Sequence, residues 1–329
     1  MSCLESWRVP VRVDLAGGTL DLWPIYALME GCLTVNAAVD LWVEIEVDRQ
    51  GVGFCVESRD LGVSFNSGEW PLAIPQRQLS WVWRVMDAAR QRPSRLSLRS
   101  PVPQGSGLGT SSCMGVGLLG ACEGLEAGAA LAARVPLLRD LEARELQTPT
   151  GWQDYFPAAL GGCLALHWEL PEPRWETLQP HPELLEDLVV FYTGKPHHSG
   201  LTNWEAYRRF IEGDAATRGA LEEIRDIARG MALAVPRDAA AVGTLLEREG
   251  KARCRLSPAV ETDAMRAVRA QGLREGWYAG MKPCGAGGGG CCLLVTPQGK
   301  RAEAIAALKA MGLTPLDVSL TPRGLHRLA

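Results

Sequence analysis

The sequence predicts an α+β protein built from two domains, and three observations support this fold class. The chain has 329 residues, which is more than one hydrophobic core usually serves. Segments with strand-like alternation and segments with helical spacing both occur, and the helical ones gather in the second half. The proline-rich segment 169–183 is the best candidate for a boundary. We therefore expect one domain at 1–172 and another at 173–329.

The first half is predicted to hold strands and helices in an irregular order. Residues 7–18 begin as a strand and end in a glycine turn. Residues 41–58 alternate apolar and polar side chains about a glycine-containing turn, which predicts a hairpin. Residues 112–125 are apolar and rich in small side chains, so they predict a buried helix. The other elements are a helix at 79–91, a strand at 94–100, a helix at 135–147 and a strand at 161–170.

The second half is predicted to hold several helices between a few strands. A strand and turn at 185–195 come first, and a glycine run leads into a buried strand at 287–297. A last strand is expected at 314–322. Helical spacing occurs at 203–213, 215–234, 238–253, 259–272 and 299–312.

Composition restricts the kind of protein. Hydrophobic residues make up 47% and charged residues 22%, as in a globular enzyme rather than a disordered or fibrous chain. The formal net charge is -4 and no run of basic residues occurs, so we expect no nucleic-acid partner. The longest near-apolar stretch, 113–122, is too short to span a bilayer. The ten cysteines lack zinc spacing, which favours reduced thiols and a cytoplasmic location.

A glycine-rich motif, PVPQGSGLGTSS at residues 101–112, suggests an anion-binding site. Three alternating glycines allow a backbone to approach a phosphate closely, and three hydroxyl residues follow where a helix should begin. No lysine precedes the hydroxyls, which excludes the P-loop pattern of nucleoside triphosphatases. An ordinary strand-to-helix turn with a serine cap is the alternative.

Two further segments accompany this motif, RVPVRVDLAGGTLDLWPIY at 8–26 and GMKPCGAGGGGCCLLVTP at 280–297. With these three segments in this order, the chain resembles the GHMP kinase superfamily. The middle motif of that superfamily reads P-x-x-x-G-L-G-S-S, and Pro103–Ser111 matches it with Thr110 in place of the first serine. The segments GLGTSS, GGTLDLWPIY and GWQD most resemble the corresponding segments of sugar kinases that act on heptose 7-phosphate or fucose-like sugars.

The resemblance implies a fold, a reaction and cofactors. It implies an N-terminal domain with a left-handed βαβ connection, which is an exception to the usual crossover rule, and a ferredoxin-like C-terminal domain. It also implies transfer of the γ-phosphoryl group of ATP, with Mg²⁺, to a hydroxyl of a small sugar or sugar phosphate in a cleft between the domains. The ATP-binding residues it implies are Pro103, Gly105, Ser106, Gly107, Leu108, Gly109, Thr110, Ser111, Ser112, Gly285, Gly287 and Gly288.

The glycine run 285–290 also fits the dinucleotide-binding pattern G-x-G-x-x-G. That fingerprint must follow a strand and open a helix, whereas these glycines lead into an expected strand, so we reject it. In GHMP kinases the corresponding loop borders the nucleotide phosphates and supports the first loop. A glycine-rich turn made only for packing is the alternative.

The resemblance assigns the catalytic pair. Asp154 matches the aspartate that galactokinase-like members use as catalytic base, and Arg12 matches the arginine of their N-terminal motif. An arginine beside the aspartate would hold it ionised and stabilise developing charge. The alternatives are a helix-capping or turn role for Asp154 and a solvated surface pair for Arg12.

The resemblance also suggests the acceptor site. Asp21 would bind sugar hydroxyls, and the residues Gly18, Thr19, His197 and Trp152 complete the expected substrate-binding set. Galactokinases carry Glu and His where this chain has Gly18 and Thr19, which argues against galactose. The role of His197 stays open, because a loop histidine is about as often a plain surface residue.

For the metal, the motif position of Ser111 supplies the hydroxyl ligand and Glu142 the carboxylate. Glu145 lies three residues further on the same helix face and is the rival carboxylate. Either glutamate could instead pair with an arginine on a wet helix face. Two alternative functions remain, a kinase of a mevalonate-like alcohol and a non-catalytic sensor that binds ATP and sugar. Whether the protein is a monomer or a homodimer also stays open.

Overall fold

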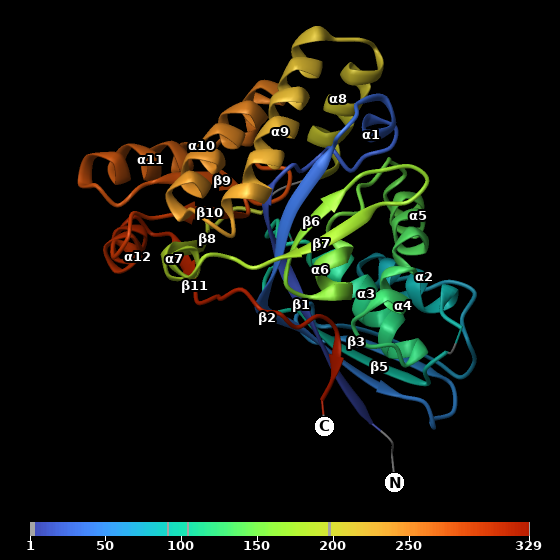
Figure 1. Ribbon diagram of the computed structural model, residues 1–329. Coiled ribbons are helices and arrows are strands. Elements are labelled where there is room, and N and C mark those ends of the chain that lie inside the picture. Colours follow the sequence, from blue (N-terminus) through green and yellow to red (C-terminus); the bar gives the residue numbers. More distant parts are fainter. Residues whose placement is uncertain (1–3, 91, 104, 197–198, 329) are drawn as a thin grey trace.

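The computed structural model describes residues 4–90, 92–103, 105–196 and 199–328, and it confirms an α+β fold with two sheets (Figure 1). The larger sheet has eight strands, with the path β12-β1-β2-β5-β3-β4, and β6 and β7 branch from β2. The smaller sheet has four strands in the order β11-β8-β10-β9.

The larger sheet is built around two long antiparallel strands, β1 and β2. They pair from Glu5 opposite Val47 to Ala16 opposite Val35, with register shifts after Pro10 and after Asp14. The strand bounds are β1 Glu5–Ala16, β2 Leu33–Asp48, β3 Phe54–Ser58, β4 Val63–Ser67, β5 Arg95–Arg99, β6 Cys163–His167, β7 Arg174–Leu178 and β12 His326–Arg327. Strand β1 is buried on both faces from Val9 onward, so its polar residues lie inside the protein.

The hairpin predicted at residues 41–58 is wrong, although both of its strands exist. Strand β5 lies between them, antiparallel to β2 and parallel to β3. The connection at residues 49–53 is long enough for this, since crossing one strand requires ~10 Å and five residues span up to ~17 Å. A local alternating pattern identifies strands, but it does not show that a later strand enters between them.

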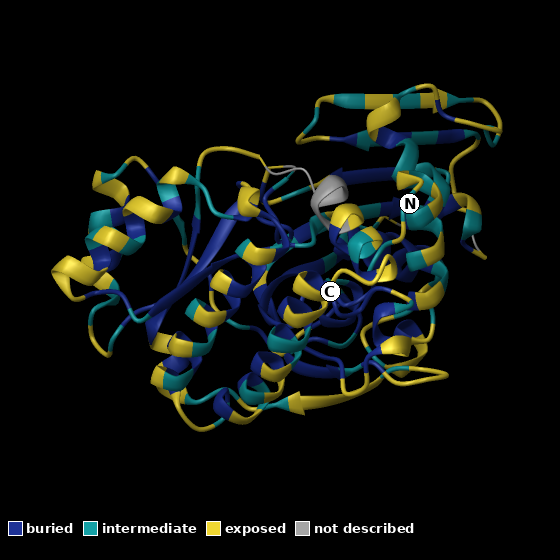
Figure 2. Ribbon diagram, turned by 90° about the horizontal axis from the view of Figure 1, so that it is seen from above, coloured by how far each residue is buried: buried dark blue, intermediate teal, exposed yellow. Residues whose placement is uncertain are grey.

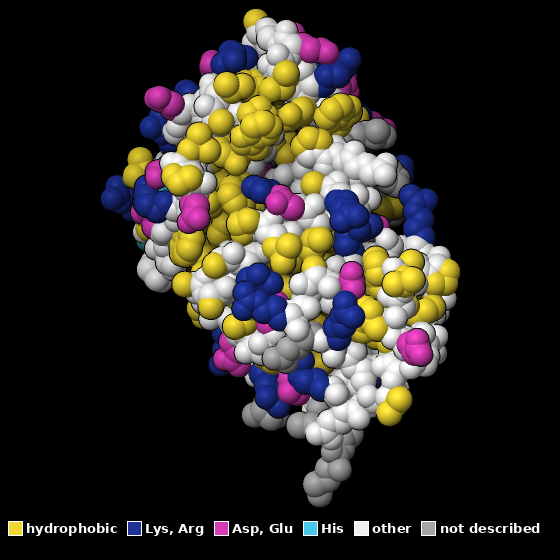
Figure 3. Space-filling view, turned by 90° about the vertical axis from the view of Figure 1, so that its right-hand side faces the viewer, with side chains coloured by type: hydrophobic (Ala, Val, Ile, Leu, Met, Phe, Trp, Pro, Cys, Tyr) yellow, Lys and Arg dark blue, Asp and Glu magenta, His cyan; other side chains and the backbone are white. Residues whose placement is uncertain are grey.

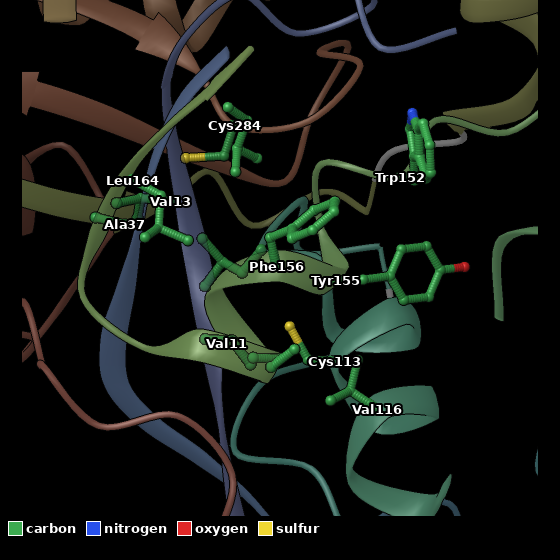
Figure 4. Packing of buried hydrophobic residues seen from close by; sticks show 14 of the residues in the cluster. Val11, Val13, Ala37, Cys113, Val116, Trp152, Tyr155, Phe156, Leu164 and Cys284 are labelled. Atoms are coloured by element: carbon green, nitrogen blue, oxygen red, sulfur yellow. The ribbon is translucent and has the colours of Figure 1, made fainter. Parts of the chain in front are cut away.

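Helix α3 is the buried helix that the small residues predicted. It packs against β1, β2 and α6, and a Cβ atom at Gly117 would lie only 2.7 Å from Cγ1 of Val9. Figure 4 shows Cys113 and Val116 of α3 beside Val11 of β1 and Phe156 of α6. The helices over this sheet are α1 Ile25–Leu28, α2 Ser80–Ala88, α3 Thr110–Glu123, α4 Ala129–Ala132, α5 Val135–Leu146 and α6 Tyr155–Leu160, with a 3₁₀ turn at Arg77–Leu79.

The smaller sheet confirms the ferredoxin-like expectation. Its strands follow the βαββαβ order and pair antiparallel throughout. They are β8 Leu188–Tyr192, β9 Gly280–Pro283, β10 Cys291–Val295 and β11 Thr314–Leu316. The helices of this half are α7 Pro182–Asp187, α8 Ser199–Ile211, α9 Ala215–Ala234, α10 Ala239–Leu256, α11 Asp263–Glu275 and α12 Arg301–Ala310, with a 3₁₀ turn at Pro258–Val260.

Helices α9 and α10 join the two sheets. Helix α9 contacts β1 and β2, whereas α10 contacts β9, β10 and β1. The main hydrophobic core runs through the larger sheet into these helices, and a second, smaller core lies between β8, β10, α11 and α12. Figure 2 shows the strands mostly buried, while the helices expose one side.

The boundary predicted between residues 172 and 173 stays a prediction. The proline-rich segment contains β7, a strand that the sequence reading missed, and β7 pairs with β6 in the larger sheet. The short strand β12, near the end of the chain, pairs with β1 in the same sheet. The larger sheet therefore takes strands from both predicted domains.

Figure 3 shows how the side chains are distributed on one side of the outer surface. There, lysine and arginine side chains are intermixed with acidic ones, and hydrophobic side chains gather on the upper half of the view. In the described part of the chain, no helix is both long and apolar enough to cross a membrane.

Candidate active site

The glycine loop before α3 leaves the helix N-terminus open for a ligand. Gly109 is the N-cap residue with φ +68°, and no side chain caps the helix. A Cβ atom there would lie 3.0 Å from Nε of Arg12, so both the backbone conformation and the close contact require glycine. Because the first backbone N–H groups of a helix have no partner within it, this end can receive an anion. The alternative of a serine-capped turn does not match this geometry.

The second glycine run supports this loop from behind. The backbone N–H of Cys291 donates to the carbonyl of Ser106 at 2.6 Å. A Cβ atom at Gly290 would lie 2.7 Å from the same carbonyl oxygen, so only glycine allows this approach. The run leads into β10, as expected, and its contacts agree with a loop that holds the first motif in place.

Arg12 and Asp154 form a bidentate ion pair beside the loop. Nε of Arg12 donates to Oδ1 of Asp154 at 3.0 Å, and Nη2 donates to Oδ2 at 2.7 Å. Nη1 of the same arginine donates to the carbonyl of Gly107 at 2.6 Å. The Arg12 side chain is only 2% exposed, so it is no surface residue. Asp154 does sit at the N-cap position of α6, but its carboxylate makes no capping bond.

This pair fixes the charge state of the arginine. Burial lowers the pKa of Arg12, but the Asp154 carboxylate and, more weakly, that of Asp14 raise it above its ordinary value. The guanidinium therefore stays charged, while the Asp154 side chain keeps 27% of its surface exposed toward solvent. Such an arrangement presents an oriented carboxylate to a bound ligand.

A cavity of about 610 Å³ brings these groups together. This volume suits a small-molecule ligand. Its wall comes from the glycine loop and the start of α3, and also from β1, the following turn and the Gln153–Asp154 segment. Arg253 of α10 and the Gly285–Ala286 loop also line it, so both predicted domains contribute.

Asp21 lies in this wall with a buried carboxylate. Its Oδ2 accepts backbone N–H bonds from Trp152 at 2.8 Å and from Gln153 at 3.0 Å. Burial raises the pKa of Asp21 to about 6, and the nearby Asp154 adds to this, although the two N–H donors oppose it. A ligand hydroxyl that donates to Asp21 would replace part of the lost hydration.

We expect Asp21→Asn to make the protein more stable near neutral pH. The raised pKa means that the charged carboxylate costs folding free energy at pH 7.5, by up to about 3 kcal/mol at 1.36 kcal/mol per pKa unit. In the wild type this loss is recovered as the pH falls through about 6 toward the ordinary value of 3.8, whereas the asparagine variant does not titrate. Denaturant unfolding at pH 7.5 and pH 5 measures this, and an equal difference between the two proteins at both pH values would contradict it.

Glu142 accepts three hydroxyl hydrogen bonds beneath the start of α3. Ser111 donates to its Oε1 at 3.0 Å and Ser112 to its Oε2 at 3.3 Å, and Tyr155 also donates to Oε2. Burial raises the pKa of Glu142, against the effect of these donors. The carboxylate and the Ser111 hydroxyl are hard oxygen donors at the cavity wall, so the pair fits the ligand preference of Mg²⁺.

Glu145, the rival carboxylate, is bound elsewhere. Ser80 donates to its Oε1 at 2.6 Å and Nε of Arg84 to its Oε2 at 2.7 Å. Glu145 is less buried than Glu142. Burial raises the pKa of Glu145, but these two partners outweigh burial and lower the pKa below its ordinary value. Glu145 does not line the main cavity in the described structure. The geometry therefore favours Glu142.

The remaining predicted residues divide into two groups. Several line the cavity, namely Gly18, Thr19, Gly105, Ser106, Gly107, Thr110, Ser112 and Gly285. Others are not among the described residues of the cavity wall, namely Pro103, Leu108, Gly287 and Gly288. Leu108 accepts the backbone N–H of Arg12, and Gly288 donates to Val260, so both act through the backbone. His197 lies outside the described residues.

The expectation for the Trp152 ring is not retained. The ring is buried among Tyr26, Phe156 and Trp168, with the guanidinium of Arg139 over it. It is absent from the described cavity wall, and its contribution there is the backbone N–H that binds Asp21. Aromatic packing explains this position, because a large apolar ring gains more from the core than from a wet cleft.

Sequence reasoning missed four charged residues, namely Asp14 and Arg253 in the cavity wall and their partners Glu249 and Lys282. Asp14 and Lys282 interrupt otherwise apolar strands within the quoted motifs. A charge in a buried strand needs a partner, and that signal would have marked both residues.

Residues 79–162 match the family described as GHMP kinases N terminal domain. This region contains the glycine loop, Glu142 and Asp154.

Three curated proteins align along most of the chain. The L-fucokinase/L-fucose-1-P guanylyltransferase of Bacteroides fragilis is 26% identical over 88% of the chain, which spans only 34% of that longer protein. The mevalonate kinase of Thermococcus onnurineus is 27% identical, with 92% of the chain and 93% of the relative aligned. The D-glycero-alpha-D-manno-heptose 7-phosphate kinase of Campylobacter jejuni is 24% identical, with 96% of both aligned.

Solved structures share the fold. A structure described as a D-glycero-D-manno-heptose 1-phosphate kinase from Bacteroides thetaiotaomicron superposes with a TM-score of 0.76 at 20% identity, and 99% of each chain is covered. At this identity the likeness establishes the architecture of the two sheets and their helices.

Proposed function

We propose that this chain is a GHMP kinase that transfers the γ-phosphoryl group of ATP to a hydroxyl of a sugar or sugar phosphate. The observation that carries this proposal is the bidentate Arg12–Asp154 pair, which shares one cavity with an uncapped helix N-terminus. For phosphoryl transfer, a protein mainly needs to bind the nucleotide phosphates, orient the acceptor hydroxyl and stabilise the charge on the transferred group.

The start of α3 is the proposed seat for the nucleotide phosphates. Its free N–H groups and the partial positive charge of the helix end favour an anion. Ser111 and Glu142 would hold Mg²⁺ through oxygen ligands, and the ion would neutralise charge on the phosphates when bound. Ser112 and Tyr155 orient the Glu142 carboxylate from its other oxygen.

Asp154 is the proposed general base. The acceptor hydroxyl gives its proton to the Asp154 carboxylate, its oxygen forms a bond to the γ-phosphorus, and the bond from that phosphorus to the bridging oxygen of ADP breaks. Arg12 orients the Asp154 carboxylate through two hydrogen bonds, and it also anchors the glycine loop through Gly107. The Arg12 side chain therefore holds both the proposed base and the glycine loop that would bind the phosphates.

Asp21 is the proposed acceptor ligand, with Gly18 and Thr19 beside it in the wall. A carboxylate that has lost its hydration binds polyol hydroxyls well, which supports a sugar. The relatives named for fucose and for heptose 7-phosphate favour those two acceptor types. The similar identity to a mevalonate kinase keeps a mevalonate-like alcohol as the second candidate. Since ATP is the proposed donor, we also propose a cytoplasmic location.

A coupled ADP-release assay tests the proposal. L-fucose, D-glycero-D-manno-heptose 7-phosphate and mevalonate serve as acceptors, each with and without Mg²⁺. We expect turnover with a sugar or sugar phosphate above the rate without acceptor. Turnover with mevalonate alone would move the assignment to the second candidate. Binding of Mg-ATP in calorimetry without turnover on any acceptor would favour a sensor.

A further inference from the structure

Four charged side chains form a buried cluster at the acceptor end of the cavity. They come from β1, α10 and β9, and they are Asp14, Glu249, Arg253 and Lys282. Asp14 and Arg253 also line the cavity. None has a side chain more than 5% exposed. Nζ of Lys282 lies 3.0 Å from Oδ2 of Asp14 and 2.9 Å from Oε1 of Glu249. The set holds two acidic and two basic side chains.

The cluster makes hydrogen bonds to two loops of the cavity wall. Oε2 of Glu249 accepts the backbone N–H of Gly17 at 2.9 Å, at the start of the turn that carries Gly18, Thr19 and Asp21. Nη2 of Arg253 donates to the carbonyl of Gly285 at 2.6 Å. Side chains of one helix, α10, therefore bind both the acceptor turn and the second glycine loop.

The fit around the turn is close. A Cβ atom at Gly18 would lie 2.7 Å from Nη1 of Arg253 and 2.7 Å from Oδ2 of Asp14. Nη1 of Arg253 also lies 3.8 Å from Asp14 and 3.7 Å from Glu249. The backbone of the turn thus rests directly on the charged groups, with no room for a side chain between them.

The environment acts differently on the two acids. Burial, with the nearby Asp14, raises the pKa of Glu249 against the effect of Lys282 and Arg253. Burial raises the pKa of Asp14, but Lys282, Arg253 and Arg12 outweigh this and lower it. Removing one member leaves an unpaired buried charge, which is strongly unfavourable. Buried ion pairs add little stability compared with well-packed apolar residues. Apolar residues, however, would not form the hydrogen bonds to the Gly17 N–H and to the Gly285 carbonyl.

We propose that these four residues are a positioning cluster, through which α10 and β9 fix the Gly17–Asp21 turn against the Gly285–Ala286 loop. The cluster sets the acceptor geometry. The effect on acceptor kinetics rests on the proposed function, whereas the effect on the turn itself does not.

Hydrogen–deuterium exchange tests the turn directly. Glu249→Met removes both the charge and the oxygen that accepts the Gly17 N–H, and Glu247→Met is the matched control. Glu247 lies on the same helix but binds Tyr278, Arg269 and Lys251 away from the cavity. We expect amides of residues 15–22 to exchange at least tenfold faster in Glu249→Met than in wild type, measured relative to those of β10. The control should leave them unchanged, and equal exchange in both variants would overturn the proposal.

A pair of variants separates positioning from stability. Lys282→Met leaves one excess negative charge, whereas Lys282→Met with Glu249→Met restores neutrality without an acceptor for the Gly17 N–H. We expect the double variant to recover thermal stability relative to the single variant but to keep fast exchange at residues 15–22. With L-fucose or D-glycero-D-manno-heptose 7-phosphate, whichever the wild type phosphorylates, its acceptor KM should rise at least tenfold while the KM for ATP stays within twofold.

The outcomes distinguish the two proposals. A double variant that regains wild-type exchange and acceptor KM together with its stability would show a merely structural ion cluster. If the wild type phosphorylates neither sugar, the proposed function fails, and the exchange comparison still decides whether the cluster holds the turn.

Discussion

Replacing Asp154 by asparagine is expected to lower kcat by at least two orders of magnitude while the affinity for Mg-ATP stays within about threefold. General-base catalysis by a positioned side chain contributes roughly 10²–10⁴-fold. The asparagine oxygen can still accept a hydrogen bond from Arg12, so the loop and the arginine should keep their places. An amide cannot take the proton of the acceptor hydroxyl. The loss therefore falls on turnover rather than on nucleotide binding.

Single-turnover kinetics and calorimetry measure the two quantities separately. Asp140→Asn is the control, since this residue sits on α5 with a 66% exposed side chain and pairs only with its neighbour Arg139 among the described residues. The control should keep wild-type kcat. If Asp154→Asn retains kcat within threefold, Asp154 is not the base, and another group must orient the hydroxyl.

The sequence predicted the local parts of this site well, because their chemistry is local. Alternating glycines before a run of hydroxyl residues specify a tight turn and a helix start, and α3 begins at Thr110. The expected Arg12–Asp154 pair joins residues 142 positions apart. It followed from family resemblance, because no spacing rule links a strand residue to a distant loop. Their contact depends on how α6 packs beside β1.

The sequence predicted pairing between distant elements less well. The hairpin at 41–58 failed because β5 enters between its strands, and the proline-rich segment hid β7. Trp152 stands in a motif, yet its ring joins the aromatic core (Figure 4). These outcomes depend on which elements pack together in three dimensions. Periodicity along the chain predicts the type of an element but not its partners in the fold.

The buried charges show both the strength and the limit of a sequence pattern. A lysine in the strand GMKPC must have a partner if the strand is buried, and Lys282 is 0% exposed. The pattern predicts that a partner exists, but it does not say that the partners are Asp14 and Glu249, which lie on other elements far along the chain.

Replacing Glu142 by glutamine is expected to lower kcat/KM for Mg-ATP by about 100-fold, or about 2.7 kcal/mol in transition-state free energy. The variant loses the negative charge that would hold Mg²⁺ beside Ser111. Its side-chain oxygen can still accept from Ser111 or Tyr155, so the start of α3 should stay in place. Raising the Mg²⁺ concentration should restore part of the activity, because the defect lies in metal affinity.

Glu145→Gln decides between the two carboxylates that the sequence left open. It lies on the same helix, but its carboxylate is held by Ser80 and Arg84, so its loss should affect the packing of α2 on α5 and leave the Mg²⁺ dependence unchanged. Titration of activity with Mg²⁺ at fixed ATP compares both variants with wild type. A shifted Mg²⁺ requirement in Glu145→Gln, with none in Glu142→Gln, would reverse the assignment. A shift in neither would mean that the protein binds the metal through the nucleotide alone, and the carboxylate beneath Ser111 would then serve only to anchor the helix.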